Sequence, residues 1–305
     1  MSALGPDLSA ETFRDAQRRT VLEGISRVPL EVAYVDRGPA DAAEVIVLLH
    51  GIPTWSYLYG AVLPLLEDHA RIIAPDFIGH GWSDRRDVSD RSLEAQARMV
   101  IALLDSLSLD RVHLVGHDTG GGVGLNLALD APERLATLTL SNAVAYDSWP
   151  IDDMIALGDP QWVRKDPAEI AEFVRGGLPD GISRPERLTK EWIEGIAAPY
   201  ADAEGALSLI RNASALNTSH TSALTPLLGR IGTPTLLLWG VDDPWQRFSD
   251  AERLERDIPG AELVAVENAS HWIPQDAPEE FARALMEFVS RHPAATEPGK
   301  PHDVA

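Results

Sequence analysis

Short apolar runs recur along the chain, and each of them leads into a turn and then into a segment with helical spacing of apolar residues. The runs cover residues 45–49, 71–74, 112–115, 135–140 and 235–239, and they are rich in Val, Ile and Leu. Uninterrupted apolar runs of this length are typical of strands that are buried on both faces of a sheet. Their alternation with amphipathic helices predicts an α/β fold with a mostly parallel central sheet and helices on both faces.

Between about residue 144 and residue 230 this alternation stops. Apolar residues keep a helical spacing at 167–175, 189–198 and 204–215, and no buried strand is evident among them. A helical insertion between two strands of such a sheet lies over their C-terminal ends, where open α/β sheets bind their ligands. We therefore expect residues 144–230 to form a helical cap over an active site.

The two ends of the chain lack this periodicity. Residues 1 to about 20 are polar and are expected to form a loose arm, and the polar, proline-rich stretch from Arg291 onward indicates a disordered tail. No basic region followed by an apolar stretch stands at the start, and no run reaches the ~18 apolar residues of a membrane span, so we expect a soluble, cytoplasmic protein. The predicted organisation is an N-terminal arm (1–20), an α/β core (21–143 and 231–290), a helical cap (144–230) and a disordered tail (291–305).

Composition and charge exclude several function classes. The 305 residues include 47 acidic and 26 basic side chains, for a formal net charge of -21, which repels nucleic acid and anionic membrane surfaces. This charge is spread along the chain and indicates a well-hydrated surface. The absence of cysteine excludes disulfides, thiolate zinc sites and a thiol nucleophile, and no His and carboxylate cluster has metal-ligand spacing. We therefore expect no metal and no cofactor.

The strongest chemical signal is a glycine-rich turn at residues 116–122, between the apolar run 112–115 and a helix-like stretch at 123–130. It has the form of a nucleophile elbow, in which flanking glycines allow a strained turn between strand and helix. The position of the nucleophile holds Asp118. A helix N-terminus favours the ionised carboxylate, which needs no base to remove a proton before it attacks. The alternative is that Asp118 only caps the helix.

Two backbone amides near this turn are candidates for binding negative charge. A His-Gly-x-Pro turn follows the run 45–49 and places the amide of Ile52 where hydrolases of this type supply a donor. Together with the amide of Thr119, it can bind a charge that develops during the reaction.

An acid and a histidine complete the candidate set. Asp242 and Asp243 follow the run 235–239, and His271 lies in a loop after a short strand at 263–266. The chain order nucleophile, acid, histidine is the order expected for this fold. We assign His271 as the base and Asp243 as the acid that orients it, with the neighbouring Asp242 as the alternative.

An aspartate nucleophile restricts the substrates. Attack on a carbonyl carbon would give a high-energy mixed anhydride, whereas attack on a tetrahedral carbon with a leaving group gives an ordinary alkyl ester. His271 would then activate water to hydrolyse this ester, which releases an alcohol and restores Asp118. Carbon–halogen bonds and epoxides are the two obvious electrophiles.

Three segments, 50–59, 75–84 and 116–121, resemble motifs of haloalkane dehalogenases and epoxide hydrolases, a branch of the α/β-hydrolase superfamily. The similarity spans roughly residues 28–290. The resemblance implies a small apolar organic substrate and water as partners, and it implies the same nucleophile, base and acid. Asn142 resembles the subgroup whose acid follows the later strand, which supports the assignment above.

The leaving group is where the sequence departs from this resemblance. Dehalogenases of this type hold the halide with a tryptophan directly after the nucleophile and with a second side-chain donor, but Thr119 and Ile52 stand at these positions. A halide would then need backbone amides or a cap tryptophan, whereas epoxide opening needs cap tyrosines as donors. The candidates are Trp149 and Trp162 for a halide, and Tyr146 and Tyr200 for an epoxide.

These residues together predict a hydrolase that cleaves an alkyl electrophile through an aspartyl ester and resembles a haloalkane dehalogenase. An epoxide hydrolase is the alternative, followed by hydrolysis of haloacids or strained lactones and by a lost activity. A protein of another class, a catalytically silent ligand-binding α/β-hydrolase, is opposed by the intact acid and base. The sequence makes no prediction of the oligomeric state.

Overall fold

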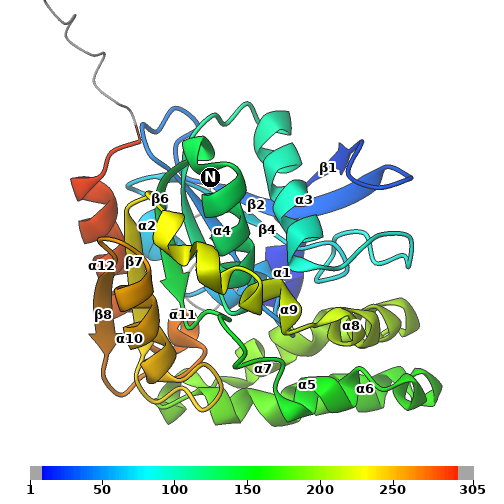
Figure 1. Ribbon diagram of the computed structural model, residues 1–305. Coiled ribbons are helices and arrows are strands. Elements are labelled where there is room, and N and C mark those ends of the chain that lie inside the picture. Colours follow the sequence, from blue (N-terminus) through cyan, green and yellow to red (C-terminus); the bar gives the residue numbers. More distant parts are fainter. Residues whose placement is uncertain (1–8, 295–305) are drawn as a thin grey trace, which may run out of the picture.

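The computed structural model describes residues 9–294 and contains an eight-stranded sheet with the strand order β1-β2-β4-β3-β5-β6-β7-β8 (Figure 1). The strands are β1 (Arg18–Leu22), β2 (Leu30–Arg37), β3 (Val45–Leu49), β4 (Arg71–Pro75), β5 (Val112–His117), β6 (Leu135–Ser141), β7 (Thr235–Gly240) and β8 (Glu262–Val266). β2 pairs antiparallel with both β1 and β4, and all other neighbours pair parallel. The predicted α/β fold is confirmed, and the five apolar runs correspond to β3 through β7.

Helices cover both faces of the sheet. Those of the core are α2 (Leu63–Leu66), α3 (Leu93–Ser106), α4 (Thr119–Asp130), α10 (Phe248–Asp257), α11 (Ile273–Asp276) and α12 (Pro278–Arg291). Successive residues of β3 point to opposite sides, so that Ile46 and Leu48 pack on the side of α2 and α12, and Val47 and Leu49 pack on the side of α3, α4 and α10. This two-sided burial explains why the strand reads as an uninterrupted apolar run.

Residues 142–234, between β6 and β7, contain helices and no strand, and we call this segment the helical insertion. Its α-helices are α5 (Asp152–Leu157), α6 (Pro167–Gly177), α7 (Lys190–Ala197), α8 (Ala203–Ala215) and α9 (Ser219–Ser222), with 3-10 turns at η3 (Pro160–Arg164), η4 (Leu178–Gly181), η5 (Pro185–Arg187), η6 (Ala198–Tyr200) and η7 (Thr225–Arg230). Figure 1 shows α5 to α8 gathered at one end of the sheet. Within residues 9–294, no helix is both long and apolar enough to cross a membrane.

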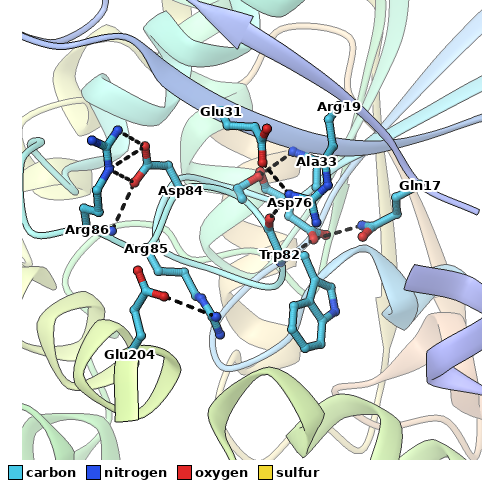
Figure 2. A network of polar contacts seen from close by, with 11 residues as sticks. Gln17, Arg19, Glu31, Ala33, Asp76, Trp82, Asp84, Arg85, Arg86 and Glu204 are labelled. Atoms are coloured by element: carbon cyan, nitrogen blue, oxygen red, sulfur yellow. Dashed lines mark hydrogen bonds and ion pairs between the residues drawn. The ribbon is translucent and has the colours of Figure 1, made fainter. Parts of the chain in front are cut away.

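The loop after β4 ties the helical insertion to the core (Figure 2). Buried Asp76 fixes this loop, because its Oδ2 accepts a hydrogen bond from the backbone N–H of Trp82 at 2.8 Å. Further along the loop, Arg85 donates to the carbonyl oxygen of Pro199 at 2.9 Å and pairs with Glu204 at 3.5 Å. The loop thus links η6 and α8 of the helical insertion to the core.

Part of the expected loose arm is folded. It contains α1 (Ala10–Asp15) and the first residues of β1. The ring of Phe13 is buried and contacts the ring of Trp55 edge-on, with 5.5 Å between centroids. Gln17 Nε2 donates to Asp76 Oδ2 at 2.9 Å, a contact drawn in Figure 2. Phe13 and Gln17 thus connect the segment to the core, and neither residue leaves a periodic pattern in the sequence.

The expected disordered tail falls largely on residues 295–305, which lie outside the described residues, as do residues 1–8. Residues 291–294 are described. There the backbone N–H of Ala294 donates to Glu44 Oε2 at 2.9 Å, so this part of the chain lies against the core.

Candidate active site

Asp118 occupies the sharp turn between β5 and α4, with φ 51° and ψ -121°. A positive φ is unusual for a residue with a side chain and is strained. The surrounding backbone is tightly packed, because a Cβ added to Gly116 would overlap the carbonyl of Gly120, and one added to Gly120 would overlap the carbonyl of Leu49. The Asp118 side chain makes no capping hydrogen bond to α4. The turn therefore has the geometry of a nucleophile elbow and not of a simple helix cap.

The Asp118 carboxylate is buried and faces a backbone donor. Its Oδ2 accepts the N–H of Ile52 at 2.8 Å. Burial raises the pKa of Asp118 to about 6, while the charge of His271 and the amides of Ile52 and Thr119 act in the opposite direction. The carboxylate is therefore ionised at neutral pH but poorly solvated, which increases its reactivity toward an electrophile.

His271 lies beside this carboxylate and is paired with an acid. Its Nδ1 is 2.8 Å from Asp243 Oδ2, and both side chains are buried. Burial lowers the pKa of His271, but the carboxylates of Asp243 and Asp118 outweigh it and leave this pKa above its usual 6.5. When Nδ1–H donates to Asp243, the neutral ring carries its free lone pair on Nε2. A general base needs such a lone pair to accept a proton.

Asp243 is fixed on both of its oxygens. Oδ1 accepts the backbone N–H groups of Trp245 at 2.8 Å and Gln246 at 3.0 Å, and Oδ2 also accepts Asn142 Nδ2 at 2.7 Å. Asp242, the alternative acid, is exposed and accepts a hydrogen bond from a serine of the helical insertion. The structure thus brings Asp243, and not Asp242, to the histidine.

Asp118, His271, Ile52 and Thr119 all border a cavity of about 320 Å³ between the core and the helical insertion. Its size is that of a site for a small molecule. The apolar part of the lining includes Val144, Trp149, Phe173, Val174, Leu178 and Trp272. These side chains give a small apolar ligand a largely apolar surface to contact beside Asp118 and His271.

The two tyrosines expected to donate to an epoxide oxygen do not border this cavity. Tyr146 has a positive φ of 54°, and its hydroxyl donates to Asp257 Oδ2 of α10 at 2.9 Å. Tyr200 is buried, and its hydroxyl donates to the carbonyl oxygen of Thr54 at 3.5 Å. Both hydroxyl groups are directed into contacts of the fold, so the expected pair of phenol donors is not assembled at Asp118.

The two tryptophans expected to hold a halide are also placed differently. Trp149 borders the cavity, but its indole N–H donates to Thr221 Oγ1 at 2.6 Å and is not free for a ligand. Trp162 does not border the cavity, and its ring packs against Phe173 with 5.2 Å between centroids. Trp149 contributes apolar surface, and Trp162 supports the cavity wall from outside.

Two residues of the cavity were not singled out in the sequence. Gln246 and Trp245 also border the cavity, and their side chains carry an amide and an indole N–H that can donate hydrogen bonds. The Trp245 ring also lies edge-on to the His271 ring at 4.9 Å. Their position two and three residues after Asp243 is the signal that could have identified them, because the loop that carries the acid must face the site.

No group of three or more His, Cys, Asp or Glu side chains in the described part of the chain is arranged to hold a metal ion. His117, which precedes the nucleophile, is buried behind His271 with 4.8 Å between ring centroids and does not border the cavity.

Known proteins match this chain over most of its length. The model of the alpha/beta hydrolase fold family matches residues 44–278. A haloalkane dehalogenase of Mycolicibacterium paratuberculosis is 30% identical over 280 residues, which cover 85% of this chain and 88% of that protein. A cis-3-alkyl-4-alkyloxetan-2-one decarboxylase of Xanthomonas campestris is 29% identical over 292 residues, 88% and 95% of the two proteins. A solved structure, an alpha/beta hydrolase fold protein from Burkholderia ambifaria, superposes with a TM-score of 0.80 at 24% identity, covering 88% of this chain and 97% of the other.

Proposed function

Because the chain belongs to the α/β-hydrolase fold family, in the branch of the haloalkane dehalogenases, we propose that it hydrolyses a small alkyl electrophile through a covalent ester on Asp118. The observation that carries this proposal is the buried Asp118 carboxylate, which borders the same cavity as the His271 that Asp243 orients. We favour a carbon–halogen bond as the electrophile, because haloalkane dehalogenases from several organisms are among the relatives of this chain.

In the first step, Asp118 attacks the carbon that bears the halogen. The amide of Ile52 holds Oδ2, which leaves Oδ1 as the attacking oxygen. A new C–O bond forms, the C–X bond breaks, and its electron pair leaves with the halide. Enclosure by the helical insertion, which we propose acts as a cap, removes water that would otherwise stabilise the carboxylate before attack.

In the second step, His271 removes a proton from water, and the oxygen of this water attacks the carbonyl carbon of the ester. The negative charge that develops on Oδ2 is bound by the amides of Ile52 and Thr119, so that these amides act as an oxyanion hole. Asp243 stabilises the imidazolium that forms. The intermediate then collapses to an alcohol and the restored carboxylate, and the net products are alcohol, halide and a proton.

The leaving halide needs donors that the predicted tryptophans do not supply. We propose that the side-chain N–H groups of Gln246 and Trp245, two residues that border the cavity, bind it together with the hydroxyl of Thr119. Amide and hydroxyl donors also suit an oxygen leaving group. The site is thus less specialised for halide than one with two indole groups.

A strained lactone is the second candidate. It is favoured by the Xanthomonas campestris relative, whose name describes action on an oxetan-2-one, and by the oxygen-compatible donors. Attack by Asp118 on the alkyl carbon of such a ring would expel a carboxylate in place of a halide. The epoxide alternative loses support, because neither of its expected tyrosines borders the cavity. A silent binding protein has no need of a carboxylate and a histidine at one cavity with an acid paired to that histidine.

The proposal is tested by turnover with a panel of 1-haloalkanes, epoxides and β-lactones, followed by release of halide, diol or acid. We expect halide release from at least one bromoalkane and a loss of about 1,000-fold or more in Asp118→Asn. Asp243→Asn should also lose activity, and Asp242→Asn, which changes the exposed neighbour, is the matched control. Halide release equal in wild type and Asp118→Asn, or none from any haloalkane, would contradict dehalogenation.

A further inference from the structure

α6 ends at two consecutive glycines, Gly176 and Gly177, and both border the cavity. Neither has a positive φ, and Gly177 has φ -86° and ψ -20°. Any L-residue adopts this backbone conformation without strain. The backbone therefore does not require glycine at either position.

Packing does not require glycine there either. A Cβ added to Gly176 or Gly177 would meet no atom within 4 Å. The other helices of the insertion differ, because a Cβ at Gly195 in α7 would collide with the Tyr57 ring, and one at Gly205 in α8 would collide with the Pro199 carbonyl. Those two glycines are explained by close approach, whereas the pair in α6 is not.

What the pair provides is open space in the cavity wall. Glycine destabilises a helix relative to alanine, so two of them at the end of α6 weaken the helix without relieving any clash. Gly176 is exposed and Gly177 is half-buried, so the open wall leads from the cavity to the solvent. Asp180, three residues farther along and exposed, also borders the cavity.

We propose that Gly176 and Gly177 form a portal that accommodates the outer part of an elongated substrate whose reacting carbon lies at Asp118. This inference rests on the proposed function only for the position of the reacting carbon. The portal, defined as these two glycines, sets the length of chain that the site accepts. Short substrates end inside the cavity and do not reach it, whereas longer, uncharged alkyl chains extend through it.

Binding of unreactive alcohols tests the portal without any turnover. Three tryptophans that border the cavity, Trp149, Trp245 and Trp272, report the binding by their fluorescence. We expect Gly177→Leu to raise the Kd of 1-octanol about tenfold or more and that of 1-butanol less than about twofold. Gly229→Leu is the matched control, because Gly229 is an exposed glycine of η7 with only one backbone atom, at 4.0 Å, near its Cβ position.

Two results would overturn the portal. Equal weakening for both alcohols would mean that the substitution disturbs the whole cavity, and unchanged binding of 1-octanol would mean that the chain leaves elsewhere or is not accommodated. The binding of each alcohol is compared with that of the Gly229→Leu control, and circular dichroism checks that each variant is folded. Absence of turnover with every electrophile would sink the proposed function and leave this binding test intact.

The lack of cysteine allows a second, independent measurement. Gly177→Cys would carry the single thiol of the chain. We expect saturating 1-octanol to slow its modification by a soluble aromatic disulfide about fivefold or more, because the bound chain covers it. The thiol of Gly229→Cys should react at the same rate with and without the alcohol. Equal rates for Gly177→Cys would place the bound chain away from the portal.

Discussion

At the scale of single residues, Asp118 combines burial with charge. The amide of Ile52 stabilises its carboxylate, yet burial prevails and raises the pKa of Asp118 to about 6. A buried carboxylate with few donors is a stronger nucleophile than a solvated one, but it costs stability when it is ionised. Function and stability therefore oppose each other at this residue.

The stability of the fold should reveal this cost. Because the folded-state pKa of Asp118 is raised from 3.8 to about 6, the group favours folding below about pH 4, and this contribution is lost as pH rises through about 6. The shift corresponds to an upper limit on the order of 3 kcal/mol. Asp118→Asn should thus unfold at higher urea concentration than wild type at about pH 8 and show a smaller gain at about pH 5. An equal gain in urea stability at both pH values would contradict a raised pKa of Asp118 in the folded state.

The rate of the first step should follow the ionisation of the same group. Only the carboxylate attacks, so kcat/KM should fall about tenfold per pH unit below about pH 6 and stay level from there to about pH 8. The apparent value belongs to Asp118 and His271 together, because each charge shifts the pKa of the other. A pH–rate profile that stays flat to about pH 4.5 would exclude an Asp118 with a raised pKa as the nucleophile.

The three candidate catalytic side chains could be predicted from the sequence, because each lies in a recognisable local motif. Asp118, Asp243 and His271 each follow a strand, so their approach to one another is fixed by the topology. The topology does not fix the direction in which a side-chain hydroxyl or indole N–H points. Tyr146 and Trp149 end in hydrogen bonds to Asp257 and Thr221, which are distant in sequence, and only tertiary packing decides such contacts.

At the scale of elements, the loop after β3 and the elbow after β5 approach so closely that one methyl group decides the geometry. A Cβ at Gly51 would overlap the Asp118 carboxylate. Gly51→Ala should therefore lower kcat/KM about 100-fold or more by displacing the nucleophile, with a folded circular dichroism spectrum. Gly232→Ala, at a position with no atom within 4 Å of the added Cβ, is the control. Wild-type activity in Gly51→Ala would contradict the placement of Asp118.

The elements that the sequence predicted are those with one dominant pattern. β3 through β7 are buried on both faces and read as apolar runs. β1 and α1 are mostly exposed or contain a single buried apolar residue, Leu22 and Phe13, so their sequences resemble a polar arm. Contacts with the folded core stabilise β1 and α1, and no local sequence pattern encodes these contacts.

At the scale of the whole molecule, the net charge and the lining of the cavity both disfavour anionic substrates. The chain carries a formal charge of -21, and the cavity is bordered by the carboxylates of Asp118, Asp153 and Asp180. None of the described residues that border it is Lys or Arg. Anionic substrates are thus repelled at a distance by the net charge and at the cavity by the carboxylates that border it.

Haloacids should accordingly be poor substrates. We expect kcat/KM for 4-bromobutanoate to be about 100-fold or more below that for its methyl ester, and the gap to narrow when ionic strength rises from about 0.01 M to about 0.5 M, because salt screens the repulsion. The neutral ester is the control and should respond little to salt. Equal kcat/KM values for the two substrates would show that the carboxylates of the cavity do not discriminate against anionic substrates.

The central claim is the covalent ester on Asp118, and trapping it is the most direct test. In His271→Phe the first step remains possible while the water is no longer activated. Incubation with 1-bromobutane should add one butyl group to the intact mass of this variant, peptide mapping should place the group on Asp118, and His271→Phe combined with Asp118→Asn should stay unmodified. An unmodified His271→Phe protein that still releases bromide, or a butyl group on any other residue, would contradict the account.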